Sequence, residues 1–210
     1  MIQEDYIIKM IKKAMEFISK ALGLAKEGEY LLSENILKDS YEDITGINLN
    51  MLMGLDVESM NDLLGNNAAE IIVTSEYLKA LGKVYKEKMD RNQFVLYYKK
   101  GLYLLLSNYK RDIYEINVNI LLFYAQVKDY MDDVKYMKCM YEFFMDRNAY
   151  KKALEVIYMM ANITNNDYDI IKLGEAFFTE VLVSNEATMK KAKWTYEEAL
   201  KSKSDFEQIK

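Results

Sequence analysis

Side chains that could carry acid–base or metal chemistry are few and poorly grouped in this sequence. Histidine is absent, and with it the most common general base, the usual activator of a nucleophilic serine or cysteine, and the commonest metal ligand. Asp129, Asp132 and Asp133 lie close together, but they lack the glycine and glutamate of a calcium-binding loop. The sequence also lacks a glycine-rich phosphate loop and a Gly-x-Ser-x-Gly motif. We therefore expect no metal site and no cofactor, and we interpret the three aspartates as the solvated start of a helix.

The remaining reactive or charged groups favour structural roles. Cys139 lies in an apolar stretch between Tyr136 and Phe143, which is typical of a small buried hydrophobic residue. Lysine clusters have acidic neighbours, a pattern typical of solvated helix faces. These clusters are Lys9, Lys12 and Lys13, then Lys99 and Lys100, then Lys190, Lys191 and Lys193. We expect a protein that is not an enzyme and does not bind nucleic acid, with an enzyme built on carboxylates and tyrosines as an alternative.

The composition favours a folded, helical chain. Hydrophobic residues make up 51% of the 210 residues, so the chain can bury a sizeable core in one domain or one elongated array. Proline is absent and only 8 glycines occur, as expected of helices joined by tight polar turns. The net charge of −5 disfavours non-specific attraction to nucleic acid or to anionic lipid.

Three features indicate a cytoplasmic protein that does not enter a membrane. The single cysteine cannot form a disulfide within the chain, which points to a reducing compartment. The amino-terminal sequence MIQEDY is acidic where a secretory signal is basic. The longest apolar run, residues 113–127, contains Asn117 and Asn119 and is too short to span a bilayer.

Apolar residues recur at three- and four-residue intervals along most of the chain and predict amphipathic helices. The first helices are expected over residues 3–26 and 30–44. Residues 45–66 are less regular, because glycines divide them into two short apolar pieces, the second capped by Asp56. We expect this stretch to be a flexible joint or an insertion, and residues 1–66 to form an amino-terminal helical region.

Regular helices resume at Asn67, which has the spacing of a capping box with Glu70. From there helical segments follow one another to residue 201, separated by turns rich in Asp and Asn. The tetrapeptide Met-Asp-Arg-Asn occurs twice, at residues 89–92 and 145–148. Because several expected helices lie between the two copies, we interpret them as non-equivalent joints that share turn chemistry.

A second periodicity is formed by turns that precede an aromatic residue. Phe94, Tyr130 and Tyr168 are about 37 residues apart, close to the tetratricopeptide period of about 34 residues. The large and small residues of such a repeat are matched by Leu78, Leu81, Gly82 and Tyr85, then Tyr98 and Gly101, and its turn by residues 28–30 and 148–153. On these residues the chain resembles tetratricopeptide-repeat-like (TPR-like) helical proteins, which we expect to be of a bacterial branch, over about residues 68–201. The proline that closes each repeat is missing.

The resemblance implies an all-α fold built as a right-handed array of antiparallel helix pairs, a TPR-like superhelix. We place helix pairs at 67–107, 112–146 and 148–184, a capping helix at 185–201 and a frayed tail at 202–210. If the second joint instead falls at the Met-Asp-Arg-Asn copy that ends at Asn148, the pairs shift by one helix. We expect Trp194, on the capping helix, to be a packing anchor, because the last unit of an array must cover its apolar face.

In TPR-like proteins the first helix of each pair lines a concave groove that holds peptide or protein segments. The resemblance makes residues 113–127 that helix in the middle pair. One of its faces, with Ile113, Ile116, Ile120, Tyr124 and Val127, is suited to packing. We expect the opposite face and the corresponding positions of the next pair to line the groove: Val118, Leu122, Ala125, Gln126, Val156 and Met160.

A helix that is apolar on all sides should be covered on both faces. The cover would be the helix at residues 7–22, folded back through residues 45–66, or a separate chain. That chain would be a partner peptide or helix, or a second copy of this protein in a homodimer. The main functional hypothesis is a non-catalytic interaction module, and the alternative is a structural homo-oligomer whose apolar faces serve self-assembly.

Overall fold

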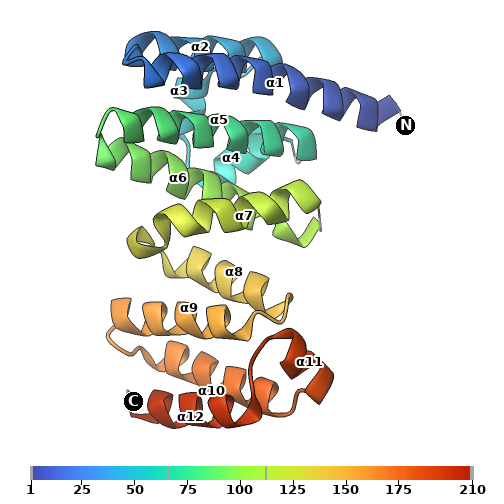
Figure 1. Ribbon diagram of the computed structural model, residues 1–210, viewed down its shortest axis with the longest axis vertical. Helices are drawn as coiled ribbons and strands as arrows, with labels where there is room; N and C mark the ends of the chain where they lie inside the picture. Colours follow the sequence, from blue (N-terminus) through green and yellow to red (C-terminus); the bar gives the residue numbers. More distant parts are fainter. Residues whose placement is uncertain (1, 66, 112, 209–210) are drawn as a thin grey trace. The chain divides into compact units, whose positions relative to one another are not determined.

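The protein is all α-helical, as predicted. A computed structural model describes residues 2–65, 67–111 and 113–208, and within these residues it contains twelve α-helices, two short 3-10 helices and no strand. Helices that are adjacent in the sequence pack against each other in pairs (Figure 1). Apolar stripes at helical spacing account for this arrangement, because each helix has one face that must be removed from water.

The chain divides into two compact units, Met1–Met131 and Asp132–Lys210. The first unit contains α1 (Ile2–Lys26), α2 (Tyr30–Thr45), α3 (Leu49–Gly54), α4 (Val57–Leu63), α5 (Ala68–Glu87), α6 (Arg91–Leu106) and α7 (Tyr114–Val127), with 3-10 helices at Tyr109–Arg111 and Lys128–Tyr130. The second unit contains α8 (Val134–Met145), α9 (Tyr150–Ile163), α10 (Tyr168–Leu182), α11 (Glu186–Lys191) and α12 (Tyr196–Glu207).

The amino-terminal helical region, residues 1–66, which we expect to be continuous with the helices that follow it, lies within the first unit. Helices α1 and α2 both pack against α5, so the amino-terminal region belongs to the same unit as the helices that follow it. Buried hydrogen bonds join α2 to α5: the Tyr41 and Thr74 hydroxyls lie 2.8 Å apart, and the Tyr77 hydroxyl donates to Ser40 over 3.0 Å. Satisfied polar pairs of this kind fix the position of one helix on another.

The stretch expected to be a flexible joint or an insertion, residues 45–66, is packed into the first unit over its described residues, 45–65, and residue 66 lies outside the described residues. Leu52, Met60 and Leu64 are fully buried, and α4 contacts α6. The Asn108 side-chain amide donates to the Asn61 side-chain oxygen over 2.7 Å. The predicted N-cap is confirmed, since the Asp56 carboxylate accepts from the Ser59 backbone amide over 2.8 Å.

Five of the described helix joints share one geometry, including those at Asn165 and Lys193, where Asn166 donates to Ala161 and Trp194 donates to Met189. Gly28, Met89 and Asn148 each have a left-handed backbone, with φ of 88°, 60° and 53°. The amide of the following residue then donates over 2.9 Å to a carbonyl in the last turn of the preceding helix: Glu29 to Leu24, Asp90 to Tyr85 and Ala149 to Phe144. This is a common way to satisfy the carbonyls at a helix end. It closes α1 onto α2, α5 onto α6 and α8 onto α9.

The two Met-Asp-Arg-Asn copies therefore lie at joints of the same kind, contrary to our expectation. They are nevertheless out of register, because the left-handed residue is the first of one copy, Met89, and the last of the other, Asn148. Identical sequence thus arises from shared turn chemistry rather than from equivalent positions.

Helix pairing in the second unit follows the alternative that is shifted by one helix. Helix α8 packs mainly against α9, and α10 packs against α9 and α12. The predicted capping helix is divided into α11 and α12, with Lys193 in a left-handed conformation between them. Trp194 is buried beside Phe177 at a ring distance of 6.1 Å, which confirms its packing role. The tail expected to fray instead continues α12 to Glu207, because Phe206 is buried.

Three glycines set the closest approaches between helices. A Cβ atom at Gly82 would lie 2.4 Å from the Tyr98 ring, and one at Gly101 would lie 2.3 Å from the Phe123 ring. In the second unit a Cβ atom at Gly174 would lie 2.1 Å from the Phe206 ring. Each aromatic ring thus occupies the volume that a side chain would fill, and it holds neighbouring helices at short range.

We expect Gly82→Ala to destabilise the protein by about 1–3 kcal/mol, as overpacking does in cores. The Tyr98 ring cannot move aside cheaply, because it is buried between Phe94 and Phe123 at ring distances of 4.9 and 5.2 Å. Urea denaturation followed by circular dichroism measures the change.

Gly23→Ala is the matched control for this substitution. Gly23 also lies in a helix, α1, but no atom would contact its Cβ within 4 Å. We expect a gain of about 0.5–1 kcal/mol from the reduced backbone entropy of the unfolded chain. Equal effects of the two substitutions would contradict the packing account.

Candidate functional site

One face of α7 is buried and the other is open. Ile116, Ile120 and Val127 are fully buried, as expected for the packing face. On the opposite face Val118 is 37% exposed and Leu122 is 51% exposed. Ala125 and Gln126 are also exposed. This helix is therefore not covered all round, although its sequence is apolar on all sides.

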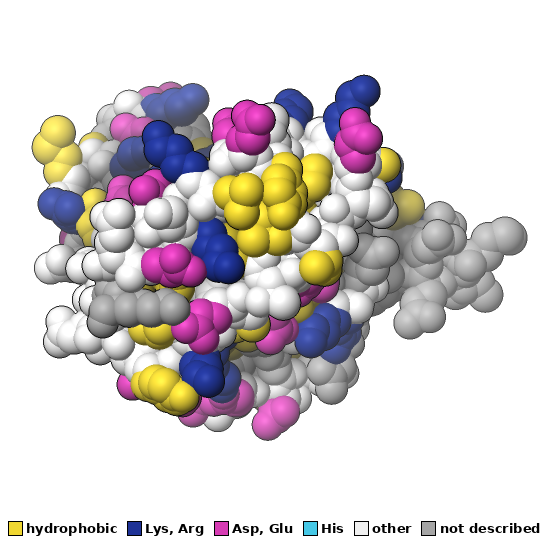
Figure 2. Space-filling view, turned by 90° about the horizontal axis from the view of Figure 1, so that it is seen from below, with side chains coloured by type: hydrophobic (Ala, Val, Ile, Leu, Met, Phe, Trp, Pro, Cys, Tyr) yellow, Lys and Arg dark blue, Asp and Glu magenta, His cyan; other side chains and the backbone are white. Residues whose placement is uncertain are grey.

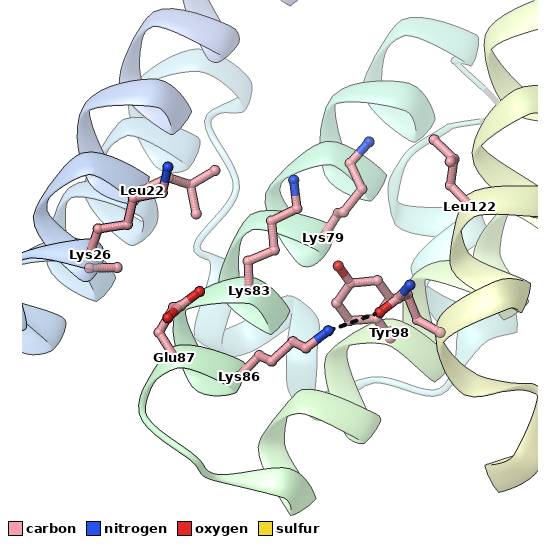
Figure 3. Close-up of a pocket in the computed structure, with 10 residues that line it drawn as sticks. Leu22, Lys26, Lys79, Lys83, Lys86, Glu87, Tyr98 and Leu122 are labelled. Carbon is pink, nitrogen blue, oxygen red and sulfur yellow. Dashed lines mark hydrogen bonds between the residues drawn. The ribbon is translucent and has the colours of Figure 1, made fainter.

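The exposed face of α7 borders a pocket of about 450 Å³ within the first unit. Figure 3 shows Leu22 and Lys26 of α1 on one side, Leu122 of α7 on the other, and lysines of α5 between them. The residues that line the pocket are Leu22, Ala25, Lys26, Lys79, Lys83, Lys86, Glu87, Tyr98, Leu122 and Gln126. Two of the predicted groove residues, Leu122 and Gln126, are thus brought to one concave surface.

Positive charge dominates the floor of this pocket. Lys79, Lys83 and Lys86 occupy one face of α5, since residues at these intervals share a side of a helix. Lys26 adds a fourth ammonium group from α1, whereas Glu87 is the only acidic residue in the lining. Neither Lys26 nor Lys83 has a hydrogen-bond or ion-pair partner among the residues that the structure describes.

A part-buried polar cluster connects the lysine face of α5 to α7. The Lys79 ammonium group lies 2.6 Å from the Glu76 carboxylate and donates to the Asn119 side-chain oxygen over 2.9 Å. The Asn119 amide in turn donates to Glu76 over 2.9 Å. Farther along the pocket the Lys86 ammonium group donates to Gln126 over 3.3 Å. These bonds hold the apolar wall at a set distance from the charged floor.

Tyr98 supplies an oriented hydrogen-bond donor. Its ring packs on Gly82 and only 4% of the residue is exposed. Its hydroxyl end points into the pocket toward the lysine side chains (Figure 3) and has no hydrogen-bond partner within the described part of the chain. Burial, with a further contribution from the negative charge of Glu76, raises the pKa of Tyr98 to about 12. The hydroxyl therefore keeps its proton at neutral pH.

Of the other four predicted groove residues, Val118 and Ala125 are exposed on α7 without lining the pocket, and the two on α9 occupy a different environment. Val156 and Met160 lie on α9 in the second unit and are 1% and 0% exposed. Helix α9 packs against both α8 and α10, so the face assigned to a groove is instead part of the core of that unit.

The N-terminal helix borders the pocket but does not cover Leu122. Ala14, Ile18 and Ala21 of α1 are buried, and this helix packs against α2 and α5. Its described side chains reach the pocket only with Leu22, Ala25 and Lys26 at its carboxyl end. The apolar face of α7 thus stays open to solvent in the chain as it stands.

Sequence analysis missed the lysines of α5 and the tyrosine beneath them. The lysine spacing was visible, because it is the one charged stripe on an otherwise apolar helix. Tyr98 and Leu22 have no such local signal, since their place in the site depends on how α6 and α1 pack on α5.

The described residues contain neither a candidate metal site nor a candidate membrane span. No three Cys, Asp or Glu side chains there are grouped so that they could hold a metal ion. None of the helices described is long and apolar enough to cross a membrane.

We expect Asn119→Ala to destabilise the first unit by about 1–2 kcal/mol, because it removes the amide that donates to the part-buried Glu76 carboxylate and the oxygen that accepts from Lys79. The matched control is Gln126→Ala, which removes one long hydrogen bond at an exposed site and should change stability by less than about 0.5 kcal/mol. Urea unfolding curves compare the two. If Asn119→Ala lowers the free energy of unfolding no more than Gln126→Ala does, the polar cluster does not hold α7 in place.

Comparisons of the chain with models of protein families, with curated proteins and with solved structures give no match. A functional assignment therefore depends on the geometry of the first unit and its pocket.

Proposed function

We propose that the protein is a non-catalytic interaction module that binds a peptide or protein segment in the pocket between α1, α5 and α7. One observation carries this proposal: Leu22 and Leu122 face each other across a lysine-lined floor, and Leu122 is 51% exposed. Concave sites with apolar walls and a few convergent polar groups are typical of ligand binding. An apolar surface left open in this way favours association.

We further propose that the chain is a TPR-like helical-repeat protein of the cytoplasm. The residues that carry the resemblance support this, because Gly82 and Gly101 of the repeat pattern are the points where Tyr98 and Phe123 pack. In such a repeat the first helix of each pair would line the binding surface, and α1 and α5 supply Leu22 and the lysines.

A second candidate function is self-assembly through the second unit. Figure 2 shows hydrophobic side chains gathered into a group on the face that it presents, with lysine and acidic side chains around it. Val183 is 80% exposed, and Tyr196 and Leu200, one turn apart on α12, are 54% and 44% exposed. Light scattering at several protein concentrations separates the two functions, since self-assembly alone gives a concentration-dependent mass.

A random peptide library displayed on phage tests the proposal with the full chain. We expect selected peptides to bind the wild-type protein and to lose at least about tenfold in affinity with Leu122→Glu, because the carboxylate would replace an apolar contact. The fold should be retained, since Leu122 is 51% exposed and lies outside the buried packing face of α7.

Leu121→Glu is the matched control on the same helix. Leu121 is 40% exposed but does not line the pocket, so this variant should keep peptide binding. Thermal melting of both variants checks that the fold is intact. If no peptide is enriched, or if enriched peptides bind Leu122→Glu as well as the wild type, the pocket is not a peptide site.

A further inference from the structure

The pocket is positively charged, whereas the chain as a whole carries a net negative charge. The protein carries a net charge of −5, yet four lysines and a single acid line this one cavity. Lys79 is neutralised locally by Glu76 at 2.6 Å. Lys26 and Lys83 have no such partner within the described residues. The concave surface therefore presents unpaired positive charge beside apolar walls.

We infer that the segment held between α1, α5 and α7 is acidic, with carboxylate side chains over Lys83 and apolar residues against Leu22 and Leu122. This inference rests on the proposed peptide-binding function and specifies the chemistry of the partner. Complementary charge steers association and selects the partner. Apolar contacts on both sides of the lysine floor would supply the remaining affinity.

The lysine spacing suits carboxylates that follow one another along a peptide. Residues four apart on a helix have Cβ atoms about 5–6 Å apart, so a carboxylate above α5 can approach two ammonium groups at once. Lys86 is partly held by Gln126 at 3.3 Å, which leaves Lys83 in the middle of the row as the main free cation. Opposite charges in a concave, partly dehydrated site attract more strongly than on an open surface.

The Tyr98 hydroxyl adds a neutral donor to the same site. It points toward the lysines, is nine-tenths buried and lacks a partner within the described chain. An acceptor on the ligand would satisfy it, and a carboxylate oxygen accepts strongly from a hydroxyl. Because the hydroxyl keeps its proton well above neutral pH, it is uncharged there and can donate a hydrogen bond to an anion.

A peptide accounts for the lining better than a nucleic acid does. Single-stranded nucleic acids bind through aromatic rings on which bases stack, together with a charged groove. The one aromatic residue in this lining, Tyr98, has its ring buried against Gly82, so no base can stack on it. The apolar walls formed by Leu22 and Leu122 instead fit aliphatic side chains.

The composition of peptides selected from the random library tests the inference. We expect the enriched peptides to be rich in Asp and Glu next to apolar residues. By fluorescence anisotropy, a selected peptide should bind Lys83→Glu at least about tenfold more weakly, as reversal of a close charge pair predicts. The same peptide with Gln and Asn in place of its acids should weaken to a similar degree, and rising salt should weaken the acidic peptide alone.

Matched variants separate binding from folding. Lys12→Glu makes the same charge change on an exposed part of α1 outside the pocket and should keep full affinity. Tyr98→Phe keeps the ring that packs on Gly82 and removes only the hydroxyl, so we expect unchanged thermal stability and several-fold weaker binding. Lys83→Gln is the milder variant if charge reversal disturbs the fold.

Each outcome decides between the two proposals. Enriched peptides that are neutral or basic, or that bind Lys83→Glu unchanged, would overturn the acidic partner and leave the peptide-binding function in place. Absence of any peptide sensitive to Leu122→Glu would overturn both. Lys83-dependent binding of a labelled single-stranded oligonucleotide, with no acidic peptide enriched, would assign the pocket to nucleic acid instead.

Discussion

The contact between an aromatic ring and a glycine governs how the first unit is built. The Tyr98 ring fills the space beside Gly82 and so holds α6 against α5. The Phe123 ring does the same at Gly101 and holds α7 against α6. The pocket depends on this chain of contacts, because the ring that packs on Gly82 also carries the hydroxyl that faces the lysines. Packing and site geometry are thus set by one residue, Tyr98.

The same contacts explain why an apolar helix has an uncovered face. Phe123 and its buried neighbours fix the inner side of α7 on α6, while Asn119 ties it to Lys79 and Glu76 of α5. These contacts use the inner side of α7, and the face with Leu122 is left exposed. A helix that is apolar on all sides therefore favours burial of every face, but a separate molecule can cover one of those faces.

Local chemistry was predictable from the sequence, and the choice of neighbours was not. Helical stripes, the cap at Asp56 and the turn at Gly28 follow from nearby residues, so they could be predicted. Leu122 and Met160 have similar apolar surroundings in the sequence, yet one is 51% exposed and the other is fully buried. The difference arises because α9 packs against helices on two sides, and periodicity within a helix does not specify how many neighbours it has.

Among the features of the first unit, the lysine row on α5 is the one that folding stability explains least. The rest of α5 is largely buried, and a stripe of any polar residues would suit the side that faces water. Alternating acids and lysines would stabilise such a stripe by about 0.2–0.5 kcal/mol per pair, whereas like charges four residues apart cost a similar amount. Glu76 and Lys79 follow the favourable rule, but Lys79, Lys83 and Lys86 repeat the same charge before Glu87 ends the row. An arrangement that repels itself in the free chain becomes favourable when an acidic partner lies across it, and this supports the proposed site.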